Sequence, residues 1–111
     1  MEYIIKIDND EHDEFEEKAD NVAVVDVYDN NGNRINDKVK VQIYLSKNAL
    51  LGLGTELIRL AHNYAEGKHY HITPAEKEMI CQRMGIFLTP DSSELIITCC
   101  NNKIIDDYFE K

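Results

Sequence analysis

The segment "GKHYHITP", residues 67–74, contains the residue types best suited to metal or acid–base chemistry. His69 and His71 are two positions apart, so in an extended strand their imidazoles point to the same side and could bind one metal ion. The third ligand of a zinc site would have to be His62, His12 or a cysteine, and none lies at a spacing that predicts convergence. We therefore favour histidines on the wet face of a strand or hydrogen-bonded to neighbouring backbone. A small metal-dependent enzyme that uses His69 and His71 is the alternative.

The cysteines offer a second possible chemistry. Cys81, Cys99 and Cys100 are an odd number without the spacing of a disulfide framework, which favours a reducing compartment. We interpret them as small buried apolar side chains; a nucleophilic pair of Cys81 with His62 stays open but has no local signature. The N-terminus lacks a basic region before its short apolar run, and no run is long enough to span a bilayer. We expect a cytosolic protein without a cofactor.

The motif "GLGT", residues 52–55, has the glycines but not the spacing of a phosphate-binding loop, and no Lys-Ser/Thr pair follows. Glycines inside a helix-forming segment reduce helix stability. We interpret these glycines as positions where the helix must approach a sheet closely, which would offset their cost.

Charge is the remaining functional signal. The 111 residues carry 12 basic and 21 acidic side chains, a net charge of −9, and seven acids lie within residues 8–17. Such a surface disfavours nucleic acid and anionic membrane, and it favours a cationic partner. The acidic stretch is either a solvated loop or a docking surface for a basic partner, and the residues alone leave both open.

These features need a scaffold, and the hydrophobic periodicity predicts one α+β domain over residues 1–111. We expect a mostly antiparallel sheet, with strands at residues 2–8, 21–28, 37–45 and 69–72. Residues 29–34 form a turn around Asn31-Gly32. Residues 85–100 read as two strands joined by a Pro-Asp-Ser-Ser turn, and a last strand lies near residues 103–105.

Two helices complete the expected fold. The long one begins near Ser46 or Asn48 and ends at Gly67, with an apolar stripe broad enough to be well covered. The stripe contains Leu50, Leu53, Leu57, Leu60, Ala61 and Tyr64, widened by Leu51, Ile58 and Ala65. The second is short and begins at Thr73-Pro74-Ala75-Glu76, which combines a capping threonine, a proline at the first helical position and a glutamate three residues after the cap.

Several segments together resemble a known class of protein: "LLGLGTELIRLAHNY", "KHYHITP", "MGIFLTPDSSELIITC" and "IIDDYF". Over most of residues 39–109 the chain is similar to the small cytosolic immunity proteins of bacterial polymorphic toxin systems, including contact-dependent growth inhibition. The resemblance implies a non-enzymatic protein that binds and neutralises the toxin domain of its own system. Many such toxins are nucleases, whose surfaces must be basic to hold phosphates.

Charge and resemblance together predict an immunity protein that binds a basic, possibly nuclease, toxin domain, with an acidic mimic of nucleic acid as a further alternative. The candidate contact surface comprises Asp10, Glu11, Asp13, Glu14, Glu16 and Glu17, with Asp106, Asp107 and Tyr108 as a second set.

Overall fold

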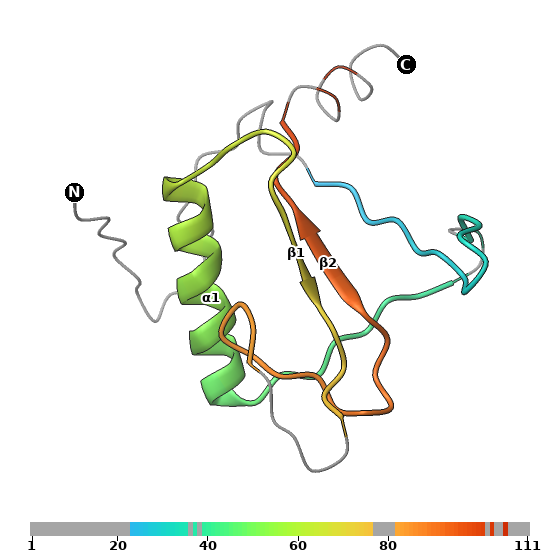
Figure 1. The fold of residues 1–111 in the computed structure, drawn as a ribbon, viewed down its shortest axis with the longest axis horizontal. Helices are drawn as coiled ribbons and strands as arrows, with labels where there is room; N and C mark the ends of the chain where they lie inside the picture. Colours follow the sequence, from blue (N-terminus) through green and yellow to red (C-terminus); the bar gives the residue numbers. More distant parts are fainter. Residues whose placement is uncertain are drawn as a thin grey trace, which may run out of the picture. The chain divides into compact units, whose positions relative to one another are not determined.

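The computed structural model describes residues 23–35, 37, 39–76, 82–101, 103 and 106. The chain divides into two compact units. One comprises Met1–Glu14 and Leu45–Cys100, and the other comprises Phe15–Tyr44 and Asn101–Lys111. The first unit contains the helix α1 (Lys47–His62) and the strands β1 (His69–Ile72) and β2 (Leu95–Thr98), labelled in Figure 1. A helix and an antiparallel strand pair agree with the predicted α+β class. That the chain is one domain stays a prediction.

Helix α1 begins where the capping signal predicts. The Ser46 hydroxyl accepts a hydrogen bond from the Ala49 N–H at 3.1 Å, which satisfies one of the donors that a helix start leaves free. The helix ends at Asn63, whose backbone N–H and side-chain amide both donate to the Arg59 carbonyl. The predicted stop at Gly67 was therefore wrong. Gly67 has a φ of +84° but belongs to the turn that leads into β1.

The apolar stripe of α1 is only partly covered. Leu60 is buried, and Ala49 and Leu53 pack against the same core. Leu50 and Leu51 are 59% and 62% exposed, so the prediction of a well-covered helix was wrong on that side.

Glycine at position 52 brings α1 against a turn. A Cβ atom on Gly52 would lie 2.2 Å from the Gly85 carbonyl oxygen, and one on Gly85 would lie 2.3 Å from the Gly52 carbonyl carbon. Side chains cannot be accommodated at either position without a shift of backbone. The predicted close approach is confirmed for Gly52, although its partner is a turn rather than a sheet. Gly54 has open space around it.

Strands β1 and β2 pair antiparallel, with Tyr70 opposite Ile97 and Ile72 opposite Leu95. The strands predicted at residues 69–72 and in the second half of 85–100 are thereby confirmed, as is the Thr89–Ser92 turn, in which the Ser92 N–H donates to the Thr89 carbonyl. Ile72, only 1% exposed, lies in the core with Leu60, Met84, Ile86 and Cys99.

The strand predicted from residue 85 is instead a tight turn followed by single bridges. Arg83 and Ile86 exchange backbone hydrogen bonds, at 2.9 and 3.3 Å, around Met84 and Gly85. Both central residues have positive φ, 57° and 80°, as in the two-residue hairpin turns that favour asparagine or glycine. Methionine in that conformation costs roughly 1–3 kcal/mol. Burial of its side chain in the core offsets the cost.

The second unit contains the turn predicted at residues 29–34. The Asp29 carboxylate accepts the N–H groups of Asn31 and Asn33, both at 2.9 Å. Gly32 has a φ of +80°, and Tyr28 forms an antiparallel bridge with Arg34.

The strands predicted on either side of that turn, at residues 21–28 and 37–45, were wrong for the residues that the structure describes. Residues 23–27, 37 and 39–45 belong to no strand, and Val25 and Val41 are 65% and 55% exposed. A run of β-branched residues satisfies only the local preference for extended backbone, whereas a strand also needs a paired neighbour.

Three other predicted elements have different outcomes. The strand at residues 2–8 lies outside the described residues. The helix start at residues 73–76 was wrong, because Pro74 bridges Leu88 and the Ala75 N–H donates to the Leu88 carbonyl at 2.8 Å. The strand near residues 103–105 was wrong at Lys103, which is helical.

Candidate functional site

The histidine pair of β1 lies on one exposed side of the strand, as its spacing predicted. The two rings are 5.2 Å apart between centroids in an edge-to-face arrangement. His69 Nδ1 donates to the Gly67 carbonyl at 3.1 Å, and His71 Nδ1 contacts a carboxylate oxygen of Glu94 at 3.0 Å. The favoured interpretation is confirmed in that both histidines are exposed and His69 bonds to neighbouring backbone, whereas the partner of His71 is a side chain.

A third metal ligand is not found beside these rings among the residues that the structure describes. Within the described parts of the chain, no group of three or more His, Cys, Asp or Glu side chains has an arrangement that could hold a metal ion. Of the sequence candidates, His62 is the last residue of α1, while His12 and Cys81 lie outside the described residues. The possible nucleophilic pair of Cys81 with His62 stays untested, because Cys81 lies outside the described residues. Cys99 is buried, as predicted, and Cys100 is partly buried.

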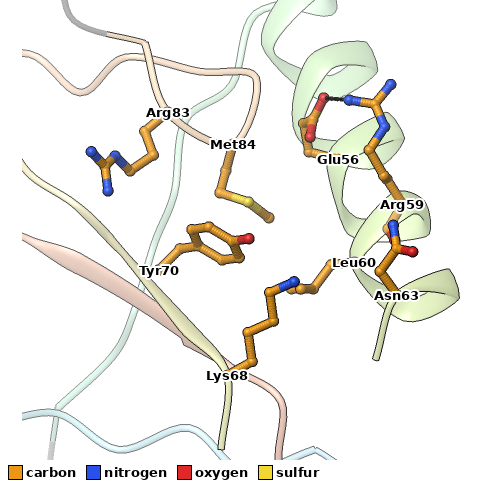
Figure 2. Close-up of a pocket in the computed structure, with 8 residues that line it drawn as sticks. All are labelled: Glu56, Arg59, Leu60, Asn63, Lys68, Tyr70, Arg83 and Met84. Atoms are coloured by element: carbon orange, nitrogen blue, oxygen red, sulfur yellow. Dashed lines mark hydrogen bonds and ion pairs between the residues drawn. The ribbon is translucent and has the colours of Figure 1, made fainter. Parts of the chain in front are cut away.

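A pocket that the sequence analysis missed lies between the end of α1 and the start of β1. It is open to solvent and has a volume of about 220 Å³. Helix α1 and its cap contribute Glu56, Arg59, Leu60 and Asn63. Lys68 and Tyr70 come from the β1 side, and Arg83 and Met84 from the tight turn (Figure 2).

Backbone contacts hold these three segments in place. The Lys68 carbonyl accepts the Cys99 N–H at 2.7 Å, and the Gly67 N–H donates to the Cys99 carbonyl at 2.8 Å, which continues the β1–β2 pairing to the edge of the pocket. The turn that carries Arg83 and Met84 is fixed against α1 by the contact between Gly52 and Gly85. The pocket is therefore built on a helix, a strand pair and a tight turn that contact one another.

The pocket is electropositive. It contains three cations, Arg59, Lys68 and Arg83, and one acid, Glu56, which is ion-paired with Arg59. The Lys68 ammonium lies 5.9 Å from the centre of the Tyr70 ring, within the range of a cation–π contact. Among the described residues, no carboxylate pairs with Lys68 or Arg83. Such a pocket can accept an anionic group.

Most of the acidic contact residues predicted from the sequence lie outside the part of the chain that the structure describes. Asp10, Glu11, Asp13, Glu14, Glu16 and Glu17 lie outside the described residues, as do Asp107 and Tyr108. Asp106 is described as helical and exposed. The acidic docking surface stays a prediction.

Comparison with known families identifies the class of protein. The family model described as Immunity protein 32 matches residues 40–100, more than half of the chain. The chain belongs to this immunity protein family. The match covers α1, β1, β2 and every residue of the pocket, whereas the acidic stretch at residues 8–17 lies outside it. The resemblance seen in the sequence is thus confirmed at the level of an immunity protein.

Membership of an immunity family indicates toxin neutralisation by a non-enzymatic protein, with a toxin protein as the partner. A search of curated proteins returns no match, and neither does a search of solved structures. None of the described helices combines the length and apolar character needed to cross a membrane.

Proposed function

We propose that this protein neutralises one cognate toxin domain by stoichiometric binding in the cytoplasm of the bacterium that produces the toxin. The match to the Immunity protein 32 family carries the proposal. A system of contact-dependent growth inhibition is the setting that the sequence resemblance favours. Unpaired cysteines at positions 99 and 100 agree with a reducing compartment.

The toxin domain in this proposal is basic and acts as a nuclease. The supporting observation is the net charge of −9, because a nuclease must present cations to hold phosphates and an acidic inhibitor can compete for that surface. The acidic stretch at residues 8–17 is the first contact surface. Asp106, Asp107 and Tyr108 form a second one.

A growth assay tests neutralisation. The assay uses the toxin domain of the same system, which we expect to be the variable C-terminal domain of a large secreted protein encoded next to this chain. Expression of that domain alone should stop growth. Co-expression of this protein should restore growth, whereas an unrelated toxin domain should remain lethal. Arrest that persists despite soluble, folded protein would refute the proposed function.

Association kinetics test the acidic surface. Replacing Asp10 and Glu11 with lysine should slow association by about tenfold or more at low salt, since charge steering raises on-rates by 10–10³, and the difference should shrink at high salt. The matched control replaces the exposed acids Asp37 and Glu76 with lysine, which changes net charge equally. Equal slowing in both variants would assign the effect to net charge rather than to this stretch.

A further inference from the structure

Two hydrogen-bond donors, the Lys68 ammonium and the Tyr70 hydroxyl, line the pocket between α1 and β1. The Tyr70 hydroxyl has no hydrogen-bond partner and the Lys68 ammonium no acidic partner in the part of the chain that the structure describes. Figure 2 shows both side chains extending from the β1 side toward α1. Two donors therefore converge on the space that an acceptor would occupy.

The charge of the pocket is opposite to that of the chain. Three cations and one acid give the pocket a formal charge of +2, whereas the whole chain carries −9. Glu56 is already paired with Arg59 and does not neutralise Lys68. Arg83 lines the pocket from the side opposite α1, but its guanidinium points away from α1 and adds to the positive charge only at longer range (Figure 2). Within an acidic protein, a pocket whose lining residues have this excess of cations is suited to an anionic group.

The residue types match those that anchor protein interfaces. Arginine, tyrosine and methionine are enriched in interfaces, and arginine and tyrosine dominate the residues that contribute most binding energy. The buried side chains of Leu60 and Met84 provide an apolar floor, which strengthens a charge-assisted hydrogen bond by excluding water. Met84 reaches this floor from a backbone conformation with a φ of 57°, and such strained residues are concentrated at functional sites.

We propose that this pocket receives the side chain of one aspartate or glutamate of the toxin domain. The Lys68 ammonium and the Tyr70 hydroxyl donate to that carboxylate, and the charges of Arg59 and Arg83 add to the attraction at longer range. A volume of about 220 Å³ admits a single acidic side chain. This assignment rests on the proposed function and adds a second, oppositely charged contact to it, inside the segment that matches the family.

The test compares charge reversal in the pocket with the same reversal outside it. Lys68→Glu should raise the dissociation rate of the complex with the toxin domain by at least about tenfold, because it leaves a carboxylate facing a carboxylate. Lys47→Glu, at the first residue of α1 and outside the pocket, is the matched control and should change the dissociation rate by less than about twofold. Tyr70→Phe, which removes only the hydroxyl, should have an intermediate effect.

Charge exchange then identifies the partner group. Reversal of the responsible toxin acid to lysine should restore binding to Lys68→Glu while weakening binding to the wild type. Equal dissociation rates for Lys68→Glu and Lys47→Glu, with both variants folded by circular dichroism, would overturn the proposal. So would tight binding of inorganic phosphate in the pocket, measured by chemical-shift changes at Tyr70 without toxin. If the wild type itself fails to bind the toxin domain, the proposed function fails first, and that result is distinct from the other two.

Discussion

The contact between Gly52 and Gly85 makes a strong prediction about stability. In the Gly52→Ala variant, the new Cβ would lie 2.2 Å from the Gly85 carbonyl oxygen, more than 1 Å inside ordinary van der Waals contact. The obstacle is backbone, so no side-chain rotation relieves the clash. Either α1 or the tight turn must move, and the turn carries the buried residues Met84 and Ile86.

The magnitude follows from two opposing effects. Overpacking of this kind costs about 3 kcal/mol at the upper end of its usual range, because neither backbone can yield alone. Alanine in place of glycine within a helix raises the free energy of unfolding by about 1 kcal/mol. We therefore expect Gly52→Ala to lower the free energy of unfolding by about 2 kcal/mol.

Gly54→Ala is the matched control on the same helix. Open space surrounds Gly54, so only the helix preference acts and this variant should gain about 1 kcal/mol. Urea unfolding followed by far-ultraviolet circular dichroism, which reports on helix content, measures the stability of both variants. Their unfolding midpoints should move in opposite directions. Equal midpoints for the two variants would refute the close approach of α1 to the turn.

Three further changes test other parts of the structure. Ser46→Ala should lower the free energy of unfolding by about 1 kcal/mol through loss of the helix cap, and Ser46→Asp, which keeps an acceptor, should restore most of it in the same urea assay. Ile72→Ala should cost about 3 kcal/mol, since this side chain is 1% exposed and its removal leaves a cavity; a loss under about 1 kcal/mol would contradict its place in the core. The hydrogen bond from the Asn33 N–H lowers the pKa of Asp29, so the contribution of this carboxylate to stability is present above the ordinary aspartate pKa and is lost as pH falls through the lowered value. A carboxyl resonance of Asp29 that titrates at or above the ordinary value would exclude that contact.

Local signals predicted the elements that depend on local interactions. The start of α1 follows from a serine whose hydroxyl satisfies a backbone donor three residues away, and the turn at residues 29–34 follows from Asp29 and Gly32 in the same way. The close approach at Gly52 was predictable because glycine within a helix carries a cost that needs an explanation. Its partner, Gly85, was not, since 33 positions separate them in the chain.

The pocket could not be predicted from the sequence because its residues come from three segments that only tertiary packing joins. Arg59, Lys68 and Arg83 are separated by 9 and 15 positions and share no periodicity. A weak signal existed in Gly85, since glycine readily adopts the positive φ that tight turns require. The strands predicted around residues 21–28 and 37–45 failed for a related reason. Their β-branched residues favour extended backbone, but pairing depends on a neighbour that the sequence does not identify.

Calorimetric titration of the purified protein with the proposed cognate toxin domain tests the central claim most directly. Neutralisation by stoichiometric binding predicts a single transition near one protein per toxin domain, with toxin activity lost in proportion to the complex formed. A toxin domain that gives no binding heat at several temperatures and stays fully active in excess immunity protein would contradict the claim.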